Sequence, residues 1–236
     1  MIIAKKRICL VASDLDGTLV DSVSIYGKTH NMLLGKYGKE LPCSTSEFWT
    51  RYFYANPEAS FDDYIQYIID TLEIPLSADE YAAEVGKAKA EMLGQVKYKS
   101  DADRLARYFK DSGIPVGIVT SSPYEDVKRM ANSPYVKNSE MPFSEYDFIV
   151  ASGNAPRKKP ESDPYRMACL SQGVHPSQTF VMEDLLDGVK SARGAGIPKE
   201  NIVGIYDENA EYEMREIKDA VGMWFNNHAE LLEVLR

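Results

Sequence analysis

Short apolar runs alternate along most of the chain with segments in which apolar residues recur at helical spacing. Five such runs predict buried strands: 7–13, 114–122, 147–152, 178–184 and 201–207. Helical patterns precede three of them, at 101–113, 163–173 and 187–196. Strands that alternate with helices are typical of βαβ units. We therefore expect an α/β fold with a Rossmann-like three-layer core, a mainly parallel sheet, and active residues past the carboxyl ends of the strands.

The stretch 22–97 breaks this alternation. It contains no strand pattern, and its helix-like segments lie near 24–38, 45–54, 60–73 and 77–94. We interpret 22–97 as an inserted α-helical domain, and 1–21 with 98–236 as the core that it interrupts. Aromatic residues at helical spacing usually pack inward. Helix-packing core is accordingly the main role expected for Phe48, Trp49, Tyr52, Phe53, Tyr54, Phe61, Tyr64 and Tyr67.

Composition narrows the class of protein. The 236 residues are 44% hydrophobic and 27% charged, which is ordinary globular usage. A net charge of −9 opposes binding to nucleic acid or anionic lipid, so neither is expected as a partner. The three cysteines are far apart and form no CxxC pair, which favours a reducing cytoplasm over a disulfide framework or a zinc site.

The first apolar run is too short to span a membrane. The acidic run 207–213 is interpreted as solvated surface.

Acidic residues follow two of the predicted strands. Asp14 and Asp16 come directly after the first, and side chains two residues apart share a side if the chain stays extended. Glu183 and Asp184 end the fourth, with Asp187 beyond. Converging carboxylates repel unless a cation lies between them, and oxygen ligands without His or Cys favour Mg²⁺ over zinc. For Asp14 and Asp16 alone, a helix N-cap and an exposed turn residue are an equally good interpretation.

Hydroxyl and lysine side chains complete the pattern. Residues 120–122, Thr-Ser-Ser, close the second strand, and 157–160, Arg-Lys-Lys-Pro, precede a helix. Such groups hold phosphoryl oxygens and offset their charge. With them the chain resembles the haloacid dehalogenase superfamily, in its phosphatase-like branch, which includes β-phosphoglucomutase and phosphoglycolate phosphatase. The resemblance depends on four motifs in the family's order: DLDGTLVDS at 14–22, VTSS at 119–122, KPESDPY at 159–165, and ED with DGVKSARGAGI at 183–197.

The resemblance implies a role for each motif residue. Asp14 would be the nucleophile that forms an aspartyl-phosphate, and Asp16 the general acid and base. Thr120 and Ser121 would bind the phosphoryl group. Lys159 would neutralise that group and orient the nucleophile, with Lys158 as its rival for this role. The metal would be Mg²⁺, with ligands from Asp14, the backbone carbonyl of Asp16, Glu183 and Asp184.

The resemblance also implies a function and a use for the insertion. The position of 22–97 resembles that of the family's helical cap. The expected activity is that of a Mg²⁺-dependent phosphatase acting on a small phosphorylated metabolite, such as a sugar phosphate or phosphoglycolate, as a monomer or homodimer. One alternative is a phosphotransferase like β-phosphoglucomutase, although Tyr26 stands where a histidine is common in such enzymes. Another is a non-catalytic phosphate-binding module. His30 is interpreted as a solvated helix residue, with a ligand of the substrate as the alternative.

Overall fold

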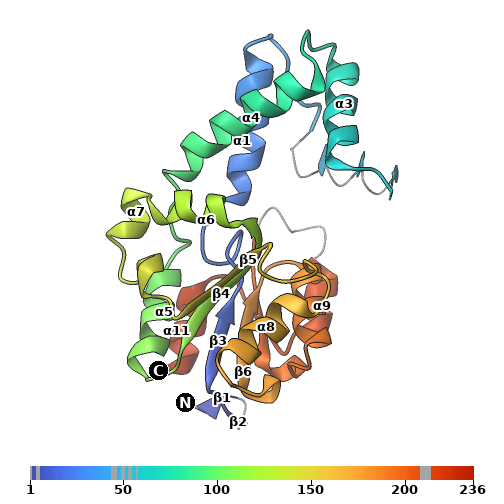
Figure 1. Cartoon of the computed structure of the whole chain (residues 1–236). Helices are drawn as coiled ribbons and strands as arrows, with labels where there is room; N and C mark the ends of the chain where they lie inside the picture. Colours follow the sequence, from blue (N-terminus) through green and yellow to red (C-terminus); the bar gives the residue numbers. More distant parts are fainter. Residues whose placement is uncertain are drawn as a thin grey trace. The chain divides into compact units, whose positions relative to one another are not determined.

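A computed structural model describes residues 2–3, 6–43, 47–48, 51–52, 55–56, 58–207 and 214–236 (Figure 1). The chain divides into two compact units. One comprises Met1–Asp21 with Gly94–Arg236, and the other comprises Ser22–Leu93. The division lies close to the boundaries expected from the sequence, and the assignment of the units as catalytic core and cap stays a prediction. No helix in the described ranges has both the length and the apolar character that a membrane crossing needs.

The larger unit is built on a six-stranded parallel sheet with the order β5-β4-β3-β6-β7-β8. Its strands are β3 (Leu10–Ser13), β4 (Val116–Pro123), β5 (Phe148–Ser152), β6 (Thr179–Glu183), β7 (Ile202–Ile205) and β8 (Met223–Phe225). The α/β prediction is confirmed. The last strand was not expected, because three half-buried residues form too short a run to detect. The predicted strand 7–13 begins at Leu10, because β1 (Ile2–Ile3) and β2 (Lys6–Arg7) form a separate antiparallel pair.

Helices cover both faces of this sheet (Figure 1). Alternate side chains of the strands point to opposite faces. The helices are α5 (Ala102–Asp111), α6 (Tyr124–Ala131), α7 (Pro134–Lys137), α8 (Asp163–Ser171), α9 (Leu186–Gly194), α10 (Met214–Ala220) and α11 (His228–Leu235). Leu10 and Ala12 join a buried cluster with Ala168 of α8 and Val189 of α9, whereas Phe180 packs on Phe109 of α5, with ring centroids 5.6 Å apart.

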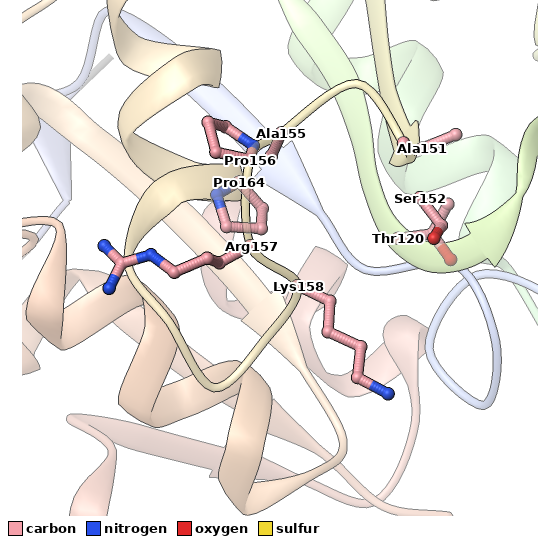
Figure 2. Close-up of a pocket in the computed structure, with 9 residues that line it drawn as sticks. Thr120, Ala151, Ser152, Ala155, Pro156, Arg157, Lys158 and Pro164 are labelled. Atoms are coloured by element: carbon pink, nitrogen blue, oxygen red, sulfur yellow. The ribbon is translucent and has the colours of Figure 1, made fainter.

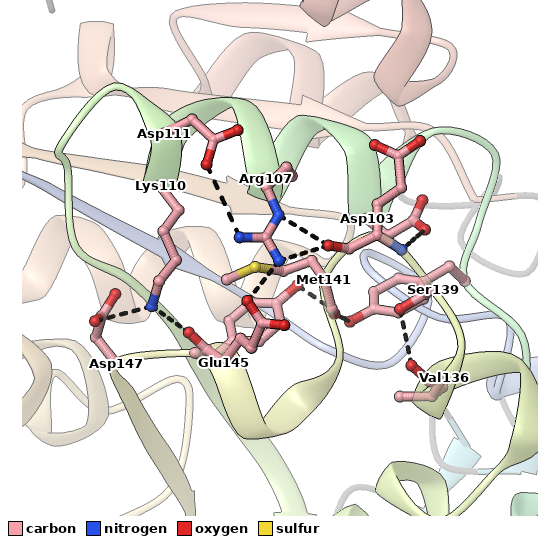
Figure 3. A network of polar contacts seen from close by, with 12 residues as sticks. Asp103, Arg107, Lys110, Asp111, Val136, Ser139, Met141, Glu145 and Asp147 are labelled. Carbon is pink, nitrogen blue, oxygen red and sulfur yellow. Dashed lines mark hydrogen bonds and ion pairs between the residues drawn. The ribbon is translucent and has the colours of Figure 1, made fainter.

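A network of polar contacts connects α5 to residues 140–147 (Figure 3). Arg107 donates from Nε and a terminal nitrogen to the backbone carbonyl of Glu140, at 2.8 and 2.7 Å, and to the Glu145 carboxylate at 2.5 Å. Lys110 donates to the carbonyl of Glu145 and to Asp147 Oδ1, the latter at 3.1 Å. These partly exposed ion pairs join α5 to the segment that leads into β5, and each is worth little in free energy.

The smaller unit is helical, with α1 (Val23–Gly35), α3 (Phe61–Leu72) and α4 (Ala78–Leu93). Its core confirms part of the aromatic prediction, since Tyr64 is fully buried and Phe48 is 6% exposed. Tyr52 is half-buried against this core. Tyr67 does not pack inward as expected, because it is 42% exposed and stacks on Phe48 at the edge of this core. Outside the described residues lie most of the predicted helix 45–54, with Trp49, Phe53 and Tyr54, and the side chain of Phe61.

His30 on α1 is buried, so its interpretation as a solvated residue is wrong. Only 4% of it is exposed, and its Nδ1 lies 2.9 Å from the Tyr81 hydroxyl. Burial lowers the pKa of His30 from 6.5 to about 4. The aromatic core that surrounds the ring is the physical reason, because it disfavours the charged imidazolium.

We expect acid to destabilise the helical unit through His30. Below pH 6.5 the unfolded chain gains a proton that the folded chain does not take until about pH 4. The contribution of neutral His30 to the free energy of unfolding is therefore fully present above pH 6.5. It is lost as the pH falls from 6.5 to about 4, by on the order of 3 kcal/mol in total. Urea unfolding of wild type and His30→Gln across pH 4–8 measures this. An unchanged pH dependence in the variant would contradict the assignment.

Candidate active site

The predicted acidic and hydroxyl residues meet at one edge of the sheet. Asp14 follows β3, Thr120 lies near the end of β4, and Glu183 ends β6. These three strands are neighbours, with β3 in the middle. The chain order also changes direction here: β4 and β5 lie on one side of β3, and β6, β7 and β8 lie on the other. Such a switch point at the carboxyl ends of parallel strands is where open α/β sheets bind ligands.

Lys159 joins the acids of the two central strands. Its ammonium donates to Asp14 Oδ1 at 2.5 Å, to Glu183 Oε1 at 2.6 Å and to the backbone carbonyl of Val119 at 2.8 Å. Burial disfavours its charged form, yet the two carboxylates outweigh burial and raise the pKa of Lys159 above its ordinary value. Lys158 is exposed and makes no ion pair in the described part of the chain. The fold thus brings Lys159, and not its rival, to Asp14.

Three carboxylates surround one point beside this lysine. Ligand atoms of Asp14, Glu183 and Asp184 all lie within 4.8 Å of one another, and all three residues are buried. Burial, followed by the charges of neighbouring acids, raises the pKa of Asp184 well above its ordinary value. Burial also raises the pKa of Asp14, aided by Glu183 and Asp16 and opposed by Lys159.

This donor set fits a hard divalent cation. It consists of oxygens alone, and the Lys159 ammonium contacts Asp14 and Glu183 but not Asp184, so a further positive charge would relieve the repulsion among the three acids. Thr18 donates to Asp184 Oδ1 at 2.7 Å, which fixes the orientation of that carboxylate. The identity of the cation stays a proposal. Asp187, the further acid noted in the sequence, is exposed and outside the cluster.

Asp16 interacts with the hydroxyls at the end of β4. Its Oδ2 accepts from Thr120 Oγ1 at 3.1 Å and from Ser122 Oγ at 2.7 Å. Ser122 is 7% exposed, whereas Ser121 is exposed. The resemblance implied that Ser121 binds the phosphoryl group, and it implied no role for Ser122. Three consecutive hydroxyl residues contain no signal that distinguishes them, because only the backbone turn decides which one points at Asp16.

Tyr165 on α8 is a site residue that the sequence did not single out. Its hydroxyl donates to Glu183 Oε1 at 2.5 Å, and the Lys159 ammonium lies 5.1 Å from its ring centroid. Tyr165 is fully buried, and burial followed by the charge of Glu183 raises its pKa well above the ordinary value. Glu183 is therefore held from two sides, by a lysine and by a neutral hydroxyl donor.

We expect Gly188→Ala to disturb this site. A methyl group at Gly188 would overlap the Glu183 carboxyl group, which cannot easily move because two hydrogen bonds hold it. Overpacking of this kind costs roughly 1–3 kcal/mol of unfolding free energy. Gly86→Ala in α4 is the matched control. Its methyl group meets nothing within 4 Å, so helix propensity should make it neutral or slightly stabilising. Urea unfolding of both variants compares them, and equal stability would contradict the prediction.

A cavity of about 250 Å³ is lined by Thr120 of β4 and by Ala151 and Ser152 of β5 (Figure 2). Figure 2 shows Thr120, Ala151 and Ser152 on one side of it, and residues of the connection to α8 on the other. Arg157 in that connection pairs with Glu161 at 3.0 Å and Asp163 at 2.8 Å, so two acids offset its charge. Thr120 lines the cavity and also donates to Asp16, so Asp16 lies one side chain away from this space.

Comparison with known proteins agrees with this geometry. The model of the family described as haloacid dehalogenase-like hydrolase matches residues 11–201. The chain is 28% identical to an uncharacterised protein of Schizosaccharomyces pombe, over 78% of this chain and 76% of that one. It is 25% identical to a phosphorylated carbohydrates phosphatase of Thermotoga maritima, over 83% and 84%. The crystal structure of a putative β-phosphoglucomutase from Thermotoga maritima shares the fold, with a TM-score of 0.75, 22% identity, and coverage of 96% and 97%.

The family match covers most of the chain and every residue of the three-acid cluster. The chain belongs to the haloacid dehalogenase-like hydrolase family, as its four motifs indicated. The prediction of a phosphatase of this type is confirmed.

Proposed function

We propose that the protein is a Mg²⁺-dependent phosphomonoesterase that transfers the phosphoryl group of a small metabolite first to Asp14 and then to water. The observation that carries this proposal is the contact of the Lys159 ammonium with both Asp14 and Glu183 in a buried cluster of three carboxylates. An ammonium beside an anionic nucleophile lets that nucleophile approach an anionic phosphate.

In the first step, an Asp14 carboxylate oxygen attacks phosphorus and the bond from phosphorus to the ester oxygen breaks. Asp16 gives a proton to the departing oxygen, so the product leaves as an alcohol. Thr120 and Ser122 hold the Asp16 carboxyl group by hydrogen bonds, which favours one orientation for this proton transfer. The result is an aspartyl-phosphate at Asp14.

In the second step, Asp16 takes a proton from water, whose oxygen attacks phosphorus and releases Asp14. Lys159 offsets charge on the phosphoryl oxygens throughout, with Ser121 as a further donor. Thr120 has one hydroxyl proton, so it would donate to the phosphoryl group when that proton turns away from Asp16. Mg²⁺ would be held by Asp14, the backbone carbonyl of Asp16, Glu183 and Asp184. When bound it supplies charge neutralisation for the phosphate and the carboxylates.

A small phosphorylated carbohydrate is the proposed class of substrate. The support is the relative of Thermotoga maritima named as a phosphatase of phosphorylated carbohydrates, which matches along most of both chains. The acidic net charge disfavours nucleic acid as a substrate.

The test is phosphate release from a panel of sugar phosphates, polyol phosphates, phosphoglycolate and nucleotides, with Mg²⁺ and with EDTA. We expect release that requires Mg²⁺ and is fastest on a sugar phosphate. Chromatography of the products separates the mutase alternative, because an isomerised sugar phosphate without phosphate release would exclude hydrolysis as the main reaction. Binding of phosphate without turnover on the panel would support the non-catalytic alternative and overturn the proposal.

A further inference from the structure

Lys99 lies where three segments of the larger unit meet. Its ammonium donates to the backbone carbonyl of Gly17 at 2.7 Å, to that of Tyr206 at 2.9 Å and to Asp207 Oδ2 at 2.7 Å. These contacts use all three N–H donors of an ammonium group. The Lys99 side chain is 19% exposed, so this is a largely buried arrangement and not a surface ion pair.

The contact with Gly17 is in the loop that carries Asp14 and Asp16. Gly17 has φ 82°, a left-handed conformation, so its carbonyl direction is specific to this turn. The next residue, Thr18, donates to Asp184 at 2.7 Å. The backbone N–H of Lys99 also donates to Leu19 O at 2.9 Å. Lys99 therefore holds the loop at two points that flank Thr18.

Asp207 is the charged partner of the Lys99 ammonium. It follows β7 and is only 5% exposed, so its interpretation as solvated surface is wrong; residues 208–213 lie outside the described part. After burial and nearer acids, the negative charge of Asp207 also raises the pKa of Asp184. The Lys99 ammonium donates to the same Asp207 carboxylate. A buried charge is tolerated when it is paired, and Lys99 supplies the pairing.

We propose that Lys99 is a positioning residue for the phosphatase site, which fixes the Gly17 carbonyl and thereby the Thr18 hydroxyl against Asp184. Asp207 holds the ammonium in place for this contact. The inference rests on the function proposed above, because it assigns Asp184 to the metal. Loss of a partner that orients a metal ligand typically lowers metal affinity or activity by roughly 10–100-fold.

Lys99→Met is the test variant, and Lys110→Met is its matched control. Lys110 also contacts a backbone carbonyl and an aspartate, but it lies near the C-terminal end of α5, in the network of Figure 3. We expect Lys99→Met to lower kcat about 10–100-fold, to raise the Mg²⁺ concentration for half-maximal rate, and to change KM little. Lys110→Met should leave all three unchanged.

Hydrogen exchange on the 14–21 peptide gives a readout that needs no activity. In the wild type, the amides of Gly17, Leu19 and Val20 donate within this loop. We expect Lys99→Met to accelerate their exchange about 10-fold or more, and Lys110→Met to leave it unchanged. Adding Asp207→Asn to Lys99→Met should not restore kcat, because the contact with Gly17 is still missing.

Three results would overturn the inference: an unchanged exchange rate in Lys99→Met, a loss of kcat shared by Lys110→Met, or recovery of kcat in the double variant. An inactive wild type on the whole substrate panel is a different outcome, since it contradicts the proposed function. The exchange experiment still decides whether Lys99 fixes the loop in that case.

Discussion

Asp14→Asn is expected to lower phosphate release by at least about 10⁴-fold, as loss of a nucleophile does in enzymes with covalent intermediates. The amide has the shape of the carboxylate but cannot form the acyl phosphate. The loss should appear in kcat, because Lys159 and Thr120 remain to bind the phosphate. A coupled phosphate assay measures it, and rapid quenching with mass analysis of the peptide that contains Asp14 should show an added phosphoryl group in the wild type alone.

The same substitution should not destabilise the protein when metal is absent. In this variant Lys159 keeps its buried ion pair with Glu183, so no charge is left without a partner. Removal of one negative charge from the crowded carboxylates also relieves repulsion on Glu183 and Asp184. Thermal unfolding with EDTA tests this. Asp187→Asn is the control, since Asp187 is exposed, and it should keep full turnover. Turnover retained by Asp14→Asn would exclude Asp14 as the nucleophile.

Lys159→Met should have the second largest effect, on both activity and stability. It removes the ammonium that contacts Asp14 and Glu183, so two buried carboxylates lose their cationic partner. Loss of one member of a buried ion pair costs roughly 3–5 kcal/mol of unfolding free energy. Turnover should fall by roughly 10²–10³-fold, as when a preorganised charge is removed from a transition state.

Lys158→Met distinguishes this effect from a general loss of positive charge. The neighbouring lysine is exposed, so we expect its removal to change unfolding free energy by no more than about 0.5 kcal/mol. Urea unfolding and kcat measured for both variants give the comparison. Equal losses of kcat in the two variants would show that the contact of Lys159 with Asp14 is not what matters.

The core strands and the acids at their ends could be predicted because both signals are local. A buried parallel strand is a short apolar run, and a polar residue that ends it marks the edge of the sheet, as at Asp14 and Glu183. β8 has no apolar run of this kind in the sequence, because it is an edge strand of only three half-buried residues. His30 and Asp207 were misjudged for a related reason: burial of a polar residue depends on what packs over it.

The class of this protein can be inferred from its sequence, since alternating strands and helices predict a parallel sheet and four motifs in the family's order put acids, hydroxyls and lysines after its strands. Which members of each group come into contact depends on the tertiary structure. Lys159 and not Lys158 reaches Asp14, Ser122 and not Ser121 contacts Asp16, and Lys99 meets Gly17 and Asp207. Adjacent residues carry the same chemistry, so composition cannot separate them. The direction of each side chain depends on backbone turns and on segments that are distant in sequence.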